Sequence, residues 1–169
     1  MSIQQFKAEQ ISKLIAIKQR FRNNERVAEI IDNHLIPKLQ SLKTHGLPDY
    51  VFTLYLASRE FNVFEDLIPS EQEVEQLIKE KGKFYYFKVK YLSRLMRLRK
   101  ELKQKYPDKI DRVENIVFEL APKLVNLRRH MLTDYLFTVT LACREFAEFC
   151  NLVPSEQEIK QLFVVPYEE

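Results

Sequence analysis

Apolar side chains recur along this chain every three or four residues, which is the period of helices that pack on one side. One such stripe is followed by a second at an interval of 85 residues. The stripes consist of Ile31, Leu35, Leu39 and Leu42, and of Ile116, Leu120, Leu124 and Leu127. Pro37 and Pro122 lie at the same point of each stripe. Because proline has no amide hydrogen, we expect it to kink or break both helices.

A longer segment repeats at the same interval. Residues 47–78 align without a gap with residues 132–163, and 19 of the 32 positions are identical. We interpret the repeat as a tandem duplication, with one module at 1–81 and the other at 83–165. Each all-α module is expected to form three long helices and one short one. Because modules of this size bury little apolar surface alone, we expect the two to pack into one helical body, about a pseudo-twofold axis.

A short motif predicts where one helix of each module begins. Pro-Ser-Glu-Gln-Glu occurs at 69–73 and again at 154–158. A serine at the N-cap and a glutamate three positions later form a capping box, so a short helix should start after each serine. Asn23 and Asp108, which are equivalent under the repeat, are the N-caps that we expect for the second helices.

The composition excludes several classes of protein. The chain has only two glycines, which rules out glycine-rich phosphate-binding loops and argues against an all-β fold with many tight turns. The sequence contains no run of about 18 apolar residues, so no membrane span is expected. The N-terminal residues lack the apolar segment of a secretory signal, and a cytoplasmic location is therefore predicted.

Cys143 and Cys150 are the only cysteines of the chain. They lie seven residues apart on what we expect to be one helix, so about 10 Å should separate them along its axis. This separation is too large for a disulfide between them. We therefore expect reduced thiols, as is usual in the cytoplasm.

The third helix of each module carries a face that both copies share. When residues 49–64 are projected around a helix, the identical positions cover one continuous arc. In the first copy the arc carries Asp49, Tyr50, Phe52, Thr53, Leu56, Ala57, Glu60, Phe61 and Phe64, and Arg59 lies at its edge. We expect this face to pack against the core, with the carboxylate of Glu60 near its centre. Because an unpaired buried charge costs several kcal/mol, Glu60 should have a partner.

Basic residues of the preceding helix are the candidate partners. In an antiparallel hairpin His45 would face Asp49, and Lys38 would lie within about one turn of Glu60. The second copy repeats these residues as Lys123, His130, Asp134 and Glu145. We interpret both sets as a structural polar network that fixes the hairpin register, and the alternative is a metal-binding or enzymatic site at the paired carboxylates. The Glu-x-x-His motif of di-metal bundles does not occur in the sequence, so we assign no metal ligand and no catalytic residue.

Positive charge is concentrated between the two repeated segments. Residues 79–109 contain twelve Lys or Arg and three Asp or Glu, a balance of +9 in a chain whose total is +3. On the projected helix, one face carries Lys90, Arg94, Arg97, Lys100 and Lys105. The first copy has no comparable cluster. Such a basic amphipathic helix is typical of a solvated surface, of a contact with an acidic protein or anionic membrane, or of a contact with nucleic acid phosphates.

The functional prediction rests on this asymmetry between the copies. We expect a non-enzymatic, adaptor-like binding or regulatory protein that uses the basic helix as its working surface. The first alternative is a nucleic-acid-binding protein that uses the same face, and the second is the metal-binding or enzymatic site at the paired carboxylates. A protein partner ranks first, nucleic acid second and an anionic membrane surface third. No cofactor is expected.

Overall fold

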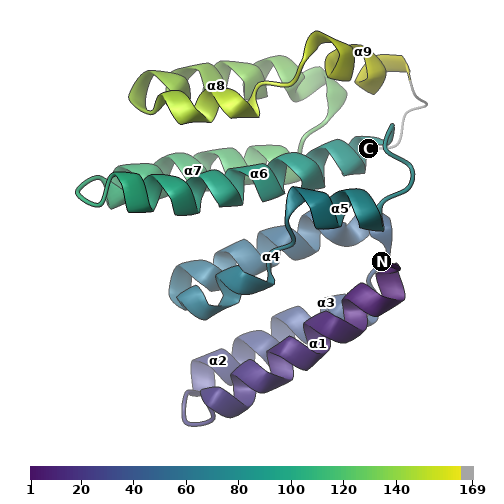
Figure 1. The fold of residues 1–169 in the computed structure, drawn as a ribbon, viewed down its shortest axis with the longest axis vertical. Coiled ribbons are helices and arrows are strands. Elements are labelled where there is room, and N and C mark those ends of the chain that lie inside the picture. The colour runs from purple at the N-terminus through teal and green to yellow at the C-terminus, as the bar shows by residue number, and fades with distance from the viewer. Residues whose placement is uncertain (165–169) are drawn as a thin grey trace. The chain divides into compact units, whose positions relative to one another are not determined.

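The computed structural model describes residues 1–164, and these residues form helices and turns without any strand. The predicted all-α fold is therefore confirmed. The chain divides into two compact units, Met1–Lys79 and Glu80–Glu169 (Figure 1). The two predicted modules, 1–81 and 83–165, stay predictions, and residue 165 lies outside the described residues.

The first unit begins with a helical hairpin and continues with a third helix and a short fourth one. In chain order its elements are α1 (Ile3–Arg20), α2 (Glu25–Glu29), the π-helical segment η1 (Ile30–Leu35), α3 (Ile36–Gln40), the 3-10 segment η2 (Thr44–Gly46), α4 (Leu47–Glu60), the 3-10 segment η3 (Asn62–Leu67) and α5 (Glu71–Leu77). Helix α1 lies beside α3, and α4 packs on η1 (Figure 1). Segment η3 folds back along α4 and reaches α1, which closes the unit.

The second unit has the same order of elements, except that one continuous helix replaces α2, η1 and α3. They are α6 (Phe84–Lys105), α7 (Ile110–Val125), the 3-10 segment η4 (Arg129–Met131), α8 (Leu132–Glu145), the 3-10 segment η5 (Ala147–Leu152) and α9 (Glu156–Val164). Helices α6 and α7 form the hairpin, α8 packs on α7, and η5 contacts both α8 and α6. The bounds of α8, η4 and η5 equal those of α4, η2 and η3 shifted by 85 residues.

The capping motif starts the short helices as the sequence predicts. The hydroxyl oxygen of Ser70 accepts a hydrogen bond from the amide of Glu73, and the Glu73 carboxylate accepts one from the amide of Ser70, each over 3.2 Å. Ser155 and Glu158 repeat the arrangement at 3.1 and 3.2 Å. Each box satisfies two amide groups that would otherwise lack partners at a helix start.

The predicted N-caps of the second helices are wrong by one residue. The side-chain oxygen of Asn24, and not that of Asn23, accepts hydrogen bonds from the backbone amides of Arg26 and Val27. In the second unit the helix follows Lys109, which makes no side-chain cap. The register of the helix within the turn decides which residue stands at the cap, and spacing in the sequence does not fix this register.

Pro37 and Pro122 have different effects although they are equivalent under the repeat. In the first unit a π-helical segment ends just before Pro37, which then lies at the start of α3. In the second unit Pro122 lies inside the continuous helix α7. The type of helix therefore changes before the proline in one unit only, so proline alone does not determine this change.

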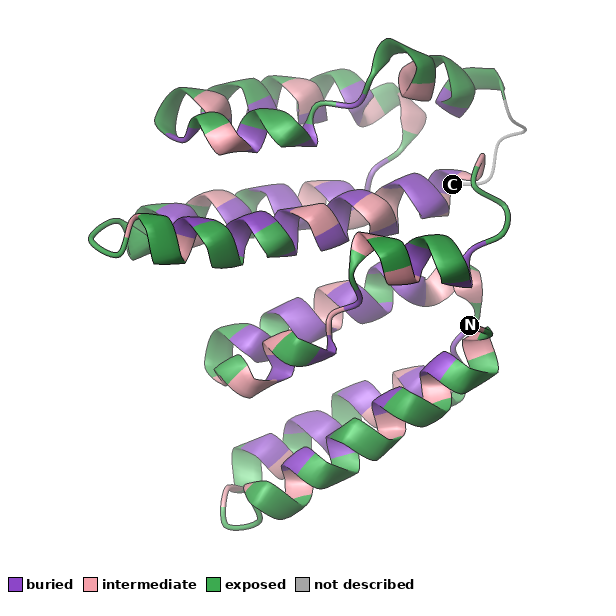
Figure 2. Cartoon of the chain, in the orientation of Figure 1, coloured by how far each residue is buried: buried purple, intermediate pink, exposed green. Residues whose placement is uncertain are grey.

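The predicted packing face of the third helix is wrong. Figure 2 shows that α4 carries both buried and exposed residues. The shared arc contributes only Tyr50 and Ala57 to the buried residues of α4, whereas Asp49 and Glu60 are exposed. The buried positions that differ between the copies are Pro48, Val51, Leu54, Tyr55 and Ser58. The helix thus buries the side that carries no carboxylate, because removing a carboxylate from water is costly.

Candidate functional site

The carboxylates that both copies share form ion pairs with the preceding helix. Nζ of Lys38 lies 2.6 Å from an Asp49 carboxylate oxygen, and Lys123 and Asp134 form the equivalent pair at 2.8 Å. Asp49 thus pairs with Lys38 and not with His45. Because both pairs join the second helix to the third at the same level, they hold the register of the two helices.

The two histidines of the predicted network are exposed. His45 lines a pocket of 380 Å³ at the corner between α3 and α4. The pocket is also lined by Lys38, Ser41, Leu42, Lys43, Gly46, Asp49 and Tyr50. His130 lies in η4 and is likewise exposed.

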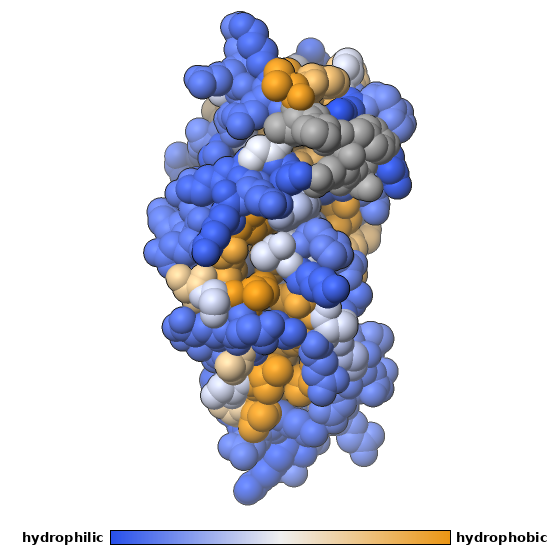
Figure 3. All heavy atoms as spheres, turned by 90° about the vertical axis from the view of Figure 1, so that its right-hand side faces the viewer, coloured by the Kyte–Doolittle hydropathy of each residue, from blue (hydrophilic) through white to orange (hydrophobic). Residues whose placement is uncertain are grey.

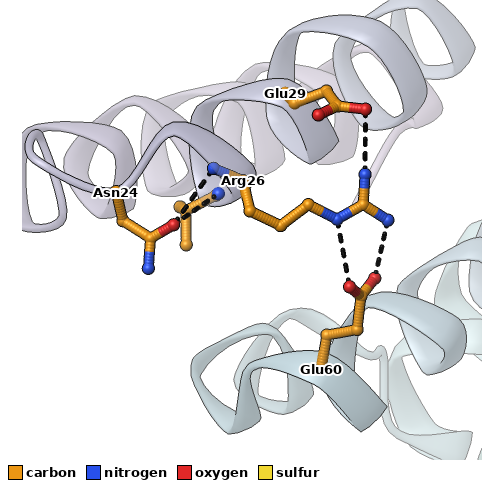
Figure 4. Close-up of polar contacts among 5 residues, drawn as sticks. Asn24, Arg26, Glu29 and Glu60 are labelled. Atoms are coloured by element: carbon orange, nitrogen blue, oxygen red, sulfur yellow. Dashed lines mark hydrogen bonds and ion pairs between the residues drawn. The ribbon is translucent and has the colours of Figure 1, made fainter.

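Glu60 has an arginine as its partner, and its predicted burial is wrong. Figure 4 shows both carboxylate oxygens accepting hydrogen bonds from Arg26, over 3.0 Å from Nε and 2.9 Å from Nη2. Arg26 also reaches Glu29 over 2.9 Å. The side chain of Glu60 is 45% exposed, so water screens the pair. The hydrogen bond from Arg26 still lowers the pKa of the Glu60 carboxyl below its ordinary value.

Glu145 has the same kind of partner at a different position of the repeat. Its carboxylate forms an ion pair with Arg112 of α7. Arg112 is equivalent to Val27 and not to Arg26, whose own equivalent is Asp111. Because Arg26 and Arg112 are not at equivalent positions, a comparison of identical positions in the two copies does not reveal either arginine. The signal that could have found them is a basic residue anywhere in the first turn of the second helix.

Between the two ion pairs of each unit, apolar side chains reach the surface. In each unit we call one set of four residues the outer stripe. It consists of Asp49, Phe52, Leu56 and Glu60 on α4, and of Asp134, Phe137, Leu141 and Glu145 on α8. The spacings of 3, 4 and 4 residues align these side chains along one side of a helix over about 16 Å. Leu56 is 38% exposed, Phe137 62% and Leu141 41%, while Phe52 is half-buried.

The outer stripes are distinguished by the repetition of the same apolar side chains in both units. On the face drawn in Figure 3, polar side chains predominate and apolar atoms show only between them. An exposed leucine or phenylalanine by itself is ordinary. Here the same two apolar types occupy the same two positions in both units, and a pair of ion pairs flanks them each time.

The basic face of α6 lies partly against the rest of the second unit. Lys90 forms an ion pair with Glu158 at 3.3 Å, and Lys105 forms one with Glu148 at 2.8 Å. The guanidinium of Arg94 donates to the backbone carbonyl oxygen of Asn151 over 2.9 Å. These three cations therefore attach α6 to η5 and α9.

The remaining members of the basic face point outward. Arg97 pairs with Glu101 on the same helix at 3.1 Å, and both side chains are exposed. Lys100 is exposed as well. The hydrogen bond between Lys105 and Glu148 raises the pKa of the lysine and lowers that of the glutamate, so both groups are charged at neutral pH. Part of the +9 charge is thus balanced by acids of other elements.

One basic residue of α6 that the helical projection did not single out is buried. Arg99 is 1% exposed, and its Nε and Nη2 lie 2.5 and 2.9 Å from the two carboxylate oxygens of Glu114 on α7. Lys103 lies 3.8 Å from the same carboxylate. The bidentate pair joins the two helices of the hairpin, and sequence spacing gave no signal for it.

The two cysteines do not lie on one helix, contrary to the prediction. Helix α8 ends at Glu145, Phe146 adopts an extended conformation, and η5 then folds back along α8. The rise along a single helix therefore does not set the distance between Cys143 and Cys150. Burial, followed by the influence of the Cys150 thiol, raises the pKa of the Cys143 thiol to about 11.

Residues 1–164 contain no group of three or more His, Cys, Asp and Glu side chains arranged to hold a metal ion. Within the same range, no helix combines the length and the apolar character that a membrane crossing requires. Comparisons of the chain with protein-family models, with curated proteins and with solved structures find no match.

Proposed function

We propose that this chain is a non-enzymatic, adaptor-like helical protein that binds a protein partner through its outer stripes. The observation that carries the proposal is the pair of exposed apolar side chains at equivalent positions of α4 and α8. We infer in addition that the two units arose by tandem duplication, since the elements as well as the residues correspond at an interval of 85.

Folding alone gives no reason for the repeated apolar surface. Buried positions of α4 such as Leu54 and Tyr55 differ from their equivalents Val139 and Thr140, although the core normally constrains sequence. Exposed Leu56 and its equivalent Leu141 are identical. A side chain that contributes little to the core yet stays the same in both copies is better explained by a contact with another molecule.

An amphipathic helix of a partner protein is the ligand that fits this surface. Apolar residues four apart on α8, Phe137 and Leu141, match the apolar spacing of a facing helix. The flanking ion pairs place one basic and one acidic group at each end of the stripe. A partner helix with charged residues about one turn beyond its apolar residues would be complementary at both ends.

The outward part of the basic face is a second candidate surface. Arg97, Lys100 and Lys105 keep exposed side chains, and a contact with an acidic protein or with nucleic acid phosphates would use these three. Two of them already have acidic partners within the second unit. A ligand would therefore have to compete with Glu101 and Glu148, which favours the outer stripes as the main surface.

A displayed library of amphipathic helical peptides tests the proposal. Peptides selected on the whole chain should bind the outer stripes, and the double substitution Phe137→Ser with Leu141→Ser should weaken the binding of peptides that dock on α8 at least about tenfold. The control is Ile15→Lys, which removes an exposed apolar residue of α1 and introduces the lysine found at the equivalent position 100. The proposal fails if the selected peptides bind both variants equally, or if the library yields no binder.

A further inference from the structure

The two cysteines of the chain lie on two elements that pack against each other at the C-terminal end of α8. Cys143 lies on α8 two residues before its last residue, and Cys150 lies in η5, which packs against the same helix. The chain reverses at Phe146, so Cys150 returns toward the end of α8 that carries Cys143, and the Cys150 thiol is one of the groups that raise the pKa of the Cys143 thiol. Cys143 is half-buried and Cys150 is exposed, and both are free thiols.

We propose that Cys143 and Cys150 are a modification site, at which they form a reversible intramolecular disulfide by exchange with a low-molecular-weight disulfide such as oxidised glutathione. In the first step the Cys150 thiolate attacks one glutathione sulfur, and a glutathione thiolate leaves. In the second step Cys143, having given up its proton, attacks the Cys150 sulfur and releases the second glutathione thiolate. Two protein thiols are oxidised, one glutathione disulfide is reduced to two glutathione thiols, and two protons pass from the cysteines to these products.

The environments of the two sulfurs suit these different roles. Cys150 is exposed, so it is the sulfur that an external disulfide reaches first. The Cys143 thiol is protonated at neutral pH because burial and the influence of the Cys150 thiol raise its pKa to about 11. Cys143 therefore reacts only when an activated sulfur is already beside it, which is the situation that the first step creates.

The pair belongs to the second unit alone. The equivalent residues of the first unit are Ser58, whose hydroxyl donates to the carbonyl oxygen of Tyr55 over 2.6 Å, and Glu65. The two backbones carry the same elements at these positions, so the first unit shows which side chains the fold accepts there. Cys143→Ser and Cys150→Glu are therefore matched controls that copy residues already present in the chain.

The disulfide would tie η5 to the end of the helix that carries an outer stripe. Leu141 lies two residues before Cys143, and Glu148, the partner of Lys105, lies two residues before Cys150. Oxidation would thereby fix the contact of η5 with α8, and through Glu148 it would also hold the C-terminal end of α6.

A redox titration tests whether the folded structure brings the thiols together. The whole chain is equilibrated with mixtures of reduced and oxidised glutathione, in native buffer and in guanidinium chloride. The reaction is then quenched with acid and the remaining free thiols are blocked with maleimide. Mass spectrometry of the intact chain counts the thiols that have formed a disulfide. We expect the folded chain to form the intramolecular disulfide at a ratio of oxidised to squared reduced glutathione at least about tenfold lower than the unfolded chain requires. An equal or higher ratio for the folded chain would overturn the proposal.

The control variants separate the two steps of the exchange. Cys143→Ser keeps the exposed thiol and should stop at the mixed disulfide with glutathione, whereas Cys150→Glu should react far more slowly. Urea unfolding of the reduced variants verifies that they remain folded. A wild-type chain that also stops at the mixed disulfide, or that forms disulfide-linked dimers in place of the internal disulfide, would contradict the assignment.

Discussion

Tyr50 donates its hydroxyl hydrogen to the side-chain oxygen of Gln10 over 2.7 Å in the interior of the first unit. The amide nitrogen of Gln10 in turn donates to the backbone carbonyl oxygen of Leu67 over 2.9 Å. The glutamine thus connects α4 to η3 through α1. All three polar groups are satisfied although water cannot reach them, and burial raises the pKa of Tyr50, so the phenol stays neutral.

The second unit reaches the same result without the glutamine. Leu95 occupies the equivalent position, and the hydroxyl of Tyr135 donates directly to the carbonyl oxygen of Leu152 over 3.3 Å. Equivalent tyrosines are therefore linked to equivalent backbone carbonyl groups in both units. The link passes through the Gln10 side chain in the first unit and is a direct hydrogen bond in the second.

Substitutions at Gln10 distinguish these two solutions. Gln10→Ala should lower the free energy of unfolding by about 1–3 kcal/mol, because it leaves buried polar groups of Tyr50 and Leu67 without a partner and opens a cavity. Gln10→Leu copies the second unit and should cost less, since leucine fills the space and Tyr50 can turn toward the carbonyl. Urea unfolding measures both, and a larger loss for Gln10→Leu than for Gln10→Ala would contradict this account.

The buried pair of Arg99 and Glu114 should be sensitive to the loss of either partner. Glu114→Ala removes the bidentate carboxylate and leaves Arg99 buried, which should destabilise the chain by roughly 3–5 kcal/mol. Adding Arg99→Leu, the residue found at equivalent position 14, should recover most of this loss because it removes the buried charge. Thermal unfolding of the single and double variants checks the expectation, and additive losses would refute it.

The pair of Arg26 and Glu60 should behave as a surface interaction with a distinct pH dependence. Its hydrogen bond lowers the folded-state pKa of Glu60 below the ordinary 4.5, so its contribution to stability is fully present above that value and is lost as the pH falls through the folded pKa. The stability difference between wild type and Glu60→Gln should therefore be small at neutral pH and smaller still near pH 3. Denaturant unfolding at both pH values measures it, and a difference that grows on acidification would contradict the sign.

The outer stripe should contribute to binding more than to stability. Phe137→Ser and Leu141→Ser should each change the free energy of unfolding by little more than a surface substitution, about 0.5 kcal/mol. Phe149→Ala, which truncates a fully buried side chain of the same unit, should cost about 3–5 kcal/mol. If the stripe substitutions destabilised the unit as much as Phe149→Ala, the stripe would belong to the core and its assignment as a binding surface would fall.

Nucleic acid binding through α6 should be weak. Lys90, Arg97 and Lys105 already have carboxylate partners, so few counterions remain to be released from a phosphate backbone. We expect a fluorescent oligonucleotide to bind with a shallow salt dependence and to respond little to Arg97→Glu with Lys100→Glu. A steep loss of affinity with salt, abolished by that double variant, would instead support the nucleic-acid-binding alternative.

The side of the third helix that faces water could not be predicted from the sequence alone. The shared arc of α4 contains apolar residues at helical spacing, and that pattern is typical of a packed face. The structure buries much of the opposite side, because Asp49 and Glu60 both lie on the arc, near the two ends of the helix, and each forms an ion pair in contact with water. A helix with apolar residues on two sides can bury either side, and its contacts with neighbouring elements determine which side is buried.

By itself, the sequence determined the all-helical fold, the capping boxes at Ser70 and Ser155 and the interval of 85 residues, because helix periodicity and capping depend on residues three or four positions apart. Only the tertiary structure decided which side of α4 and α8 faces water, which arginine pairs with Glu60, and that the segment carrying Cys150 folds back along the helix that carries Cys143. These outcomes depend on where chain reversals place distant segments, and the energies that separate the alternatives are small sums over many contacts.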